Sequence, residues 1–193
     1  MRLAILDSGH TFWTRTLFAL IRVVSRQPLP EVLKLIKYRP DFFGKQMAAV
    51  THIAMRGPSN WSIGDRELMA AFISKINECE YCTRAHTAVA TRAYLDKAKV
   101  AAALSNLDTA PVKKPLRATL HMLAKLTREQ TVSADEMRAL LSSGVSREQI
   151  EDALAICFAF NTINRLAEAF AFAVPGPEAF EVGAKFLLAR GYR

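Results

Sequence analysis

The sequence predicts an all-α protein, and three observations support that prediction. Of its 193 residues, 51% are hydrophobic and 23% are charged, which is the balance of a folded domain with a substantial core. Val, Ile and Thr rarely gather into alternating runs, so the evidence for strands is thin. Ala, Leu, Glu, Lys and Arg dominate long stretches instead. The length allows one large domain or two very small ones.

An amphipathic helix is predicted near the N-terminus, over residues 10–24. Its apolar positions recur at helical spacing, and Arg15 and Arg22 share the opposite face. Such a helix can lie on a membrane, but more often it packs on its own domain or on a neighbouring subunit. It is too short to span a bilayer, and no small-residue cleavage site follows it, so we expect a cytoplasmic protein. The apolar positions are Trp13, Leu17, Leu20, Ile21 and Val24.

Between this helix and a later cysteine pair, breakers and one capping box mark three helices. Arg39-Pro40 ends the first, because a residue before proline disfavours helical backbone angles. Gly57-Pro58 stops the second. Ser62 and Asp65, three residues apart, form a capping box that opens the third. The predicted helices span residues 31–37, 42–55 and 62–77.

Capping residues and breakers separate six helices in the remainder of the chain. Asp96 caps one helix, and Pro115 suits the first turn of another. Ser133 and Ser146 each begin a capping box. Pro175-Gly-Pro177 breaks the longest helix. The predicted helices span residues 79–94, 96–105, 115–128, 133–144, 146–173 and 178–190.

The formal net charge is +8, and most of it lies in residues 1–60. That segment contains nine Lys or Arg residues and three acids. A basic excess can indicate affinity for nucleic acid or for an anionic membrane. No helix-turn-helix, zinc finger or run of five basic residues accompanies it, so we expect a solvated surface with no nucleic-acid partner and no membrane contact.

The pair Cys79-Glu-Tyr-Cys82 is the main candidate for chemistry, because C-x-x-C serves dithiol reactions, zinc and iron–sulfur clusters. If Cys79 begins a helix, Cys82 and His86 lie on the same helix face, since spacings of three, four and seven bring side chains together. Backbone N–H groups at a helix start favour a thiolate, and His86 can take or deliver its proton. Glu67 on the preceding helix is a candidate to orient His86, although an acid on such a helix is more often solvated.

The segment from Asp65-Arg-Glu67 through Asn77-Glu-Cys-Glu-Tyr-Cys-Thr-Arg-Ala-His86 closely resembles the alkylhydroperoxidase-D-like family of the carboxymuconolactone decarboxylase superfamily. That family's motif is a glutamate, a C-x-x-C twelve residues later and a histidine four residues beyond the second cysteine, a pattern that Glu67, Cys79, Cys82 and His86 match. Phe160-Asn-Thr-Ile-Asn-Arg-Leu166 is similar to a stretch of the peroxidase-related members. The resemblance covers about residues 28–175. It implies a helical bundle whose central antiparallel hairpin carries C-x-x-C at the start of its second helix.

The resemblance also implies a function, namely that of a thiol-dependent hydroperoxide reductase with antioxidant activity. In this interpretation Cys82 attacks the peroxide, Cys79 resolves the sulfenic acid to a disulfide, and His86 and Glu67 transfer protons. An external dithiol reductant restores the pair, no cofactor or metal takes part, and the protein is a homo-oligomer, either a trimer or a hexamer. The helix-start argument by itself favours Cys79 as the attacking thiol. Tyr81 stands where the best-studied branch has a second relay histidine, so the relay is expected to be shorter here.

Four alternatives remain open from the sequence: a general dithiol–disulfide oxidoreductase, zinc held by the cysteine pair and His86 with Glu67, decarboxylation of a lactone, and a non-enzymatic protein that docks through its basic N-terminal helix. We expect residues 1–27 to form an amphipathic helix or arm, and residues 28–193 to form a helical domain that resembles the alkylhydroperoxidase-D-like family. Cys157 lies in an apolar run and is expected to be a buried free thiol. Three polar residues on the longest helix are expected to form hydrogen bonds across helices or subunits. They are Asn161, Asn164 and Arg165.

Overall fold

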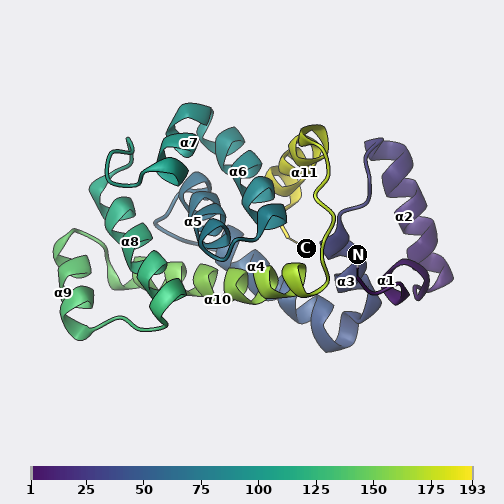
Figure 1. The fold of residues 1–193 in the computed structure, drawn as a ribbon, viewed down its shortest axis with the longest axis horizontal. Helices are drawn as coiled ribbons and strands as arrows, with labels where there is room; N and C mark the ends of the chain where they lie inside the picture. The colour runs from purple at the N-terminus through teal and green to yellow at the C-terminus, as the bar shows by residue number, and fades with distance from the viewer. Residues whose placement is uncertain (1, 193) are drawn as a thin grey trace.

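The computed structural model describes residues 2–192, and eleven α-helices and one π-helix, with no strand, make up the secondary structure of that range (Figure 1). The all-α prediction is confirmed. The helices are α1 (Ile5–Ser8), α2 (Phe12–Ser25), α3 (Glu31–Tyr38), the π-helix η1 (Pro40–Gly44), α4 (Lys45–Arg56), α5 (Ile63–Ile76), α6 (Glu80–Tyr94), α7 (Lys97–Ser105), α8 (Lys114–Glu129), α9 (Ala134–Ser142), α10 (Arg147–Ala169) and α11 (Pro177–Arg190).

Most predicted helix bounds agree with the structure to within a few residues, because their caps form as expected. Ser62, Ser133 and Ser146 each accept a hydrogen bond from the backbone of the third helical residue, whose own side chain returns the bond in a capping box. Asp96 caps α7 by a single bond, in which its side chain accepts from the backbone N–H of Lys99.

Three details of the prediction are wrong. The short helix α1 was not expected, and the residues before α4 form a π-turn, in which the Gly44 N–H donates to the carbonyl of Arg39 five residues earlier. The longest helix ends at Ala169 rather than at residue 173. Its end is set by Ala171, which has a positive φ of 50° and donates its N–H to the carbonyl of Glu168. The chain therefore leaves the helix before it reaches the prolines.

Helices α5 and α6 form the expected central hairpin, and α4, α7, α8, α10 and α11 pack against it (Figure 1). The turn between the two helices is short, because Glu78 adopts the left-handed conformation with φ of 57°. Helix α5 contacts α4, α6, α8 and α10, so most of its side chains are buried. Fully buried side chains from α5, α8 and α10, among them Leu68, Leu120 and Phe160, fill the core.

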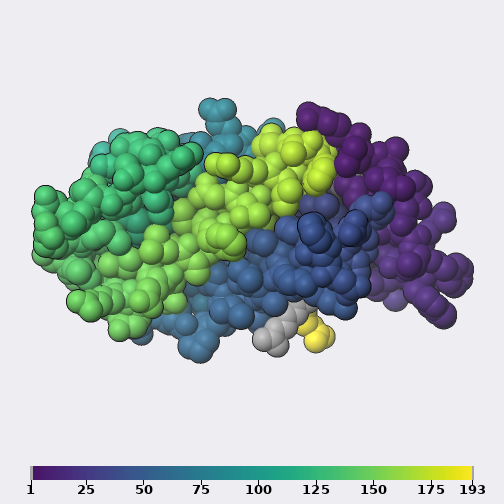
Figure 2. Space-filling view, turned by 90° about the horizontal axis from the view of Figure 1, so that it is seen from below, coloured from purple at the N-terminus to yellow at the C-terminus, as the bar shows by residue number. Residues whose placement is uncertain are grey.

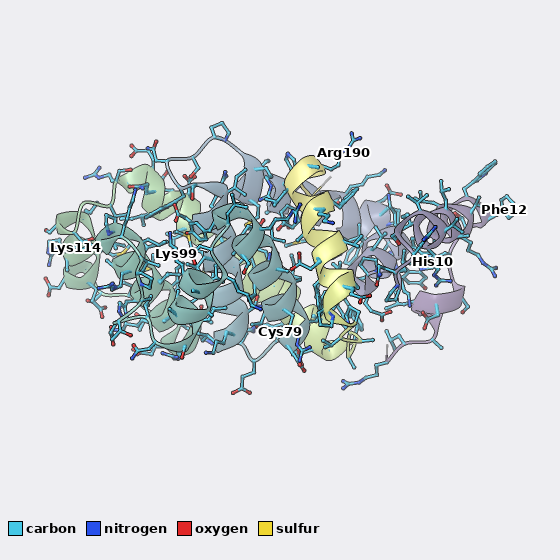
Figure 3. The ribbon with its side chains drawn as sticks, turned by 90° about the horizontal axis from the view of Figure 1, so that it is seen from above. His10, Phe12, Cys79, Lys99, Lys114 and Arg190 are labelled. Carbon is cyan, nitrogen blue, oxygen red and sulfur yellow. The ribbon has the colours of Figure 1, made fainter. Side chains whose placement is uncertain are left out.

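Helices α1 and α2 lie at one end of the molecule, beyond α3 (Figures 1 and 2). Phe18 is the buried residue of α2, whereas Trp13 is 79% exposed and Val24 is 76% exposed. Phe12 projects from this end, away from the body of the protein (Figure 3). Much of the apolar face predicted for this helix is therefore open to solvent in the single chain. The boundary at residue 27 stays a prediction.

Among residues 2–192 there is no helix both long enough and apolar enough to cross a membrane.

Candidate functional site

Cys79 lies at the junction of the central hairpin, where it is the N-cap residue of α6, beside α11 (Figure 3). Its backbone N–H donates to the carbonyl of Ser74 at 2.9 Å, which anchors the start of α6 to the last turn of α5. Cys82 follows in the first turn of α6, as the spacing predicts. Both thiols are free and buried, with 0% of Cys79 and 2% of Cys82 exposed.

The two thiols form a hydrogen-bonded pair with unequal acidity. A hydrogen bond from Cys82 lowers the pKa of Cys79, and it outweighs burial and the nearby Glu168, which both raise it. Donating that hydrogen bond raises the pKa of Cys82 well above its ordinary value, and burial raises it further. The first proton therefore leaves Cys79, and Cys82 keeps its proton as the donor.

Glu67 and His86 meet across the interface of α5 and α6. Oε2 of Glu67 lies 2.8 Å from Nδ1 of His86, and the Glu67 side chain is completely buried. The expected contact between the two helices is present, so the interpretation of Glu67 as a solvated residue is wrong. With Nδ1 facing the carboxylate, Nε2 is the nitrogen of His86 left for other partners.

Two further residues, Arg56 and Tyr192, complete the surroundings of Glu67. Nη2 of Arg56 lies 2.6 Å from Oε1 of Glu67, and the Tyr192 hydroxyl donates to the same oxygen at 2.8 Å. Burial raises the pKa of Glu67, but the hydrogen bond and charge of His86 and the charge of Arg56 outweigh it, so that the pKa lies below its ordinary value. Glu67 is therefore held as a carboxylate.

An apolar cavity of about 270 Å³ adjoins these groups. Of the four motif residues, Cys82 and His86 are among the described residues that line it, and Cys79 and Glu67 are not. The ring of Phe160, fully buried, packs edge-on against His86 with a centroid separation of 4.4 Å and forms part of the wall. Further apolar wall is supplied by Val32, Leu35, Ile163, Phe172, Phe180 and Leu187.

Tyr81, which takes the place of a relay histidine in the resemblance, lies in an aromatic cluster. Its ring packs edge-on against Phe172 at 5.4 Å and against Phe180 at 5.9 Å. Burial raises the pKa of Tyr81 far above its ordinary value, so the hydroxyl stays protonated. Tyr81 therefore helps to form a wall of the cavity rather than to carry charge.

The sequence predicts that three polar residues of α10 form hydrogen bonds to other helices, and two of them do so. Asn164 is buried and accepts a hydrogen bond from Ser74 Oγ at 3.0 Å, and Asn161 accepts one from Asn77 at 3.0 Å. Both bonds join α10 to the end of α5, which supports the turn that holds Cys79. Arg165 is exposed, and Cys157 is a buried free thiol, as expected.

Within the described range, residues 2–192, no three His, Cys, Asp or Glu side chains are grouped so as to hold a metal ion. Both oxygens of Glu67 already accept hydrogen bonds from other side chains. The zinc alternative therefore has no support in the positions of these side chains.

Sequence reasoning missed Arg56 and Tyr192. Arg56 is the last residue of α4, where a basic side chain is ordinary, and Tyr192 lies 125 residues from Glu67. Neither residue stands at a spacing that points to the motif.

Residues 42–124 match the model of the Carboxymuconolactone decarboxylase family. The fold is similar to that of an uncharacterized peroxidase-related protein from Silicibacter sp. TM1040, with a TM-score of 0.76, 27% identity and 91% of each chain covered. It is also similar to an uncharacterized peroxidase-related protein from Ralstonia eutropha JMP134, described as an alkylhydroperoxidase AhpD core, with a TM-score of 0.75, 23% identity and 92% of each chain covered. A comparison with curated proteins gives no match.

Proposed function

Because this chain belongs to the carboxymuconolactone decarboxylase superfamily as an alkylhydroperoxidase-D-like member, we propose that it is a thiol-dependent reductase of organic hydroperoxides. The observation that carries the proposal is the position of the apolar cavity, which meets one thiol of a hydrogen-bonded pair and a histidine held by a buried carboxylate. A peroxide in that cavity has a nucleophile and a proton donor beside it.

Cys82 is the attacking residue in this proposal, because it lines the cavity, and Cys79 supplies the base. As the peroxide binds, the proton of Cys82 passes along the hydrogen bond to the Cys79 thiolate. The Cys82 sulfur then attacks the terminal oxygen of the hydroperoxide, the O–O bond breaks, and Cys82 becomes a sulfenic acid. The departing alkoxide takes a proton from protonated His86 and leaves as the alcohol.

In the second step Cys79 attacks the sulfenic acid sulfur. The S–S bond forms, and the hydroxyl group leaves with the Cys79 proton as water. The dithiol has lost two electrons to the peroxide, and His86 is left neutral. An external dithiol then returns two electrons and two protons to the pair, which prepares it for another turnover.

The substrate favoured by this site is an apolar hydroperoxide rather than a protein disulfide. The cavity walls are mostly aliphatic and aromatic, so an alkyl or aryl group gains affinity there by leaving water. A folded protein disulfide has poorer access, because both thiols are buried. The general dithiol–disulfide oxidoreductase is therefore the second candidate, restricted to small disulfides.

The proposal is tested by replacing each cysteine with serine and following cumene hydroperoxide consumption and sulfenic acid trapping. We expect Cys79→Ser to accumulate a trapped sulfenic acid on Cys82, Cys82→Ser to lose turnover, and the matched variant Cys157→Ser to retain it. Trapping on Cys79 in Cys82→Ser, together with no trapping on Cys82 in Cys79→Ser, would reverse the two roles. Equal rates in all variants and in thiol-alkylated protein would remove the peroxidase proposal and favour a reaction such as lactone decarboxylation.

A further inference from the structure

The last residues of the described chain turn back into the site instead of continuing α11. Gly191 ends that helix with a positive φ of 71°. A Cβ atom there would lie 2.7 Å from the His52 ring and 3.2 Å from the Arg56 side chain, so a larger residue fits neither the backbone angle nor the space. The backbone N–H of Tyr192 then donates to Nδ1 of His52 at 3.2 Å, which fixes the direction of the turn.

Tyr192 contacts three members of the site at once. Its hydroxyl donates to Oε1 of Glu67 at 2.8 Å. Its ring lies nearly parallel to His86, at an angle of 16° with 6.2 Å between centroids, and the Arg56 guanidinium lies 5.0 Å from the ring centre. Burial and the charge of Glu67 raise the pKa of Tyr192 well above its ordinary value, so the hydroxyl stays protonated and remains a donor.

We propose that Tyr192 and Arg56 are positioning residues that fix the orientation and tautomer of His86. Together they occupy Oε1 of Glu67, which leaves Oε2 for the N–H at Nδ1 of His86. The cavity-lining imidazole then presents Nε2 as its exchangeable nitrogen. The inference deepens the proposed hydroperoxide reductase and rests on it for its catalytic consequence.

The electrostatic surroundings explain why both residues are needed. A buried carboxylate with an unpaired oxygen is costly, and a carboxylate with a free oxygen can rotate and offer His86 either one. Arg56 supplies the balancing charge, and the Tyr192 hydroxyl supplies a directed second donor. The titratable and charged groups around the Glu67–His86 pair are Arg56 and His52 from α4, Arg66 from α5, the Cys82 thiol from α6 and Tyr192 from the end of the chain.

The test compares full-length Tyr192→Phe and Arg56→Lys with a matched control, Tyr94→Phe. Tyr94 likewise donates its hydroxyl to a carboxylate on α5, that of Asp65, but it lies outside the cavity. The first readout is the tautomer of neutral His86, read from the ¹⁵N shifts of its imidazole in reduced protein at a pH high enough to remove the second ring proton. The second is kcat and KM for cumene hydroperoxide.

We expect Tyr192→Phe, which keeps the ring but loses the donor, to show a mixture of the two His86 tautomers. Its kcat should fall by about 10-fold with KM within about 2-fold, the lower end of the 10- to 100-fold cost of losing the partner that orients a metal-ligating histidine. Arg56→Lys keeps the charge and should retain most of the Nδ1–H form. Tyr94→Phe should match the wild type in both readouts.

The tautomer measurement needs no peroxide, so the two proposals fail separately. Wild-type protein with the Nδ1–H form but no turnover would remove the proposed function and leave the positioning role of Tyr192 intact. A Tyr192→Phe variant with unchanged tautomer and kcat, like Tyr94→Phe, would overturn the positioning role.

Discussion

Replacing Glu67 by glutamine should destabilise the protein strongly, because it breaks an ion pair that is almost entirely buried. The Arg56 side chain is only 8% exposed and Glu67 is 0% exposed, so neither charge can turn to water. Removal of one partner from such a pair costs about 3–5 kcal/mol, since the other charge stays buried without compensation. For a protein of this size that loss corresponds to a decrease in melting temperature of about 6–20 °C.

The measurement is urea denaturation of Glu67→Gln beside a control, Glu80→Gln. Glu80 pairs with Arg84 at 2.6 Å, but the two side chains are 60% and 52% exposed. An exposed pair of this kind contributes at most about 1 kcal/mol, so the control variant should unfold close to the wild-type midpoint. The difference between the variants therefore isolates the effect of burial.

The effect should also depend on pH in a definite direction. The pKa of Glu67 lies below its ordinary value of 4.5 in the folded protein, so its ionised form stabilises the fold fully above that value. This stabilisation is lost as the pH falls through the lower, folded-state pKa. The difference in unfolding free energy between wild type and Glu67→Gln should be full at pH 7 and decrease in strong acid. A loss at pH 7 no larger than that of Glu80→Gln, or one that grows on acidification, would contradict a stabilising role for the buried Glu67 carboxylate.

Three other perturbations test the packing, the caps and the N-terminal arm. Phe160→Ala should lower the free energy of unfolding by about 3–5 kcal/mol in urea titration, because a fully buried ring beside His86 is removed, and a loss below about 1 kcal/mol would contradict that packing. Ser62→Ala should cost about 0.5–2 kcal/mol in thermal unfolding through loss of the α5 capping box, and no change would mean that the cap contributes nothing. Joint replacement of Trp13 and Val24 by serine should shift a homo-oligomer toward smaller species in sedimentation velocity with helix content unchanged, since both side chains are largely exposed in the single chain. An unchanged mass distribution would exclude the arm from assembly.

Local signals in the sequence were sufficient for the helices that hold the site. The capping box at Ser62 and Asp65 lies within one turn, and so does the spacing from Cys79 to Cys82, so both could be interpreted without knowledge of the fold. The position of Glu67 next to His86 required the hairpin to close, and the family resemblance indicated that it does. For these residues, the helix positions expected from capping and spacing are the positions found in the folded protein.

The missed features depend on how distant segments pack. Arg56 reaches Glu67 because the end of α4 lies against α5, and Tyr192 does so because Gly191 reverses the chain after α11. No periodicity in the sequence encodes either approach. The π-turn before α4 also depends on packing between segments. Gly44 lies so close to α3 that a Cβ atom there would lie 2.0 Å from the carbonyl oxygen of Ile36. That contact belongs to the packing of η1 on α3.

In the function that we propose, Cys79 and Cys82 form a redox-active dithiol that reduces a hydroperoxide. The most direct measurement is a titration of reduced protein with cumene hydroperoxide, in which free thiols are counted and any disulfide is located by mass spectrometry. We predict the rapid loss of two thiols per chain and a Cys79–Cys82 bond that a dithiol reagent reverses, with Cys157 still reduced. Thiols that stay reduced, or that oxidise no faster than free cysteine, would contradict the claim.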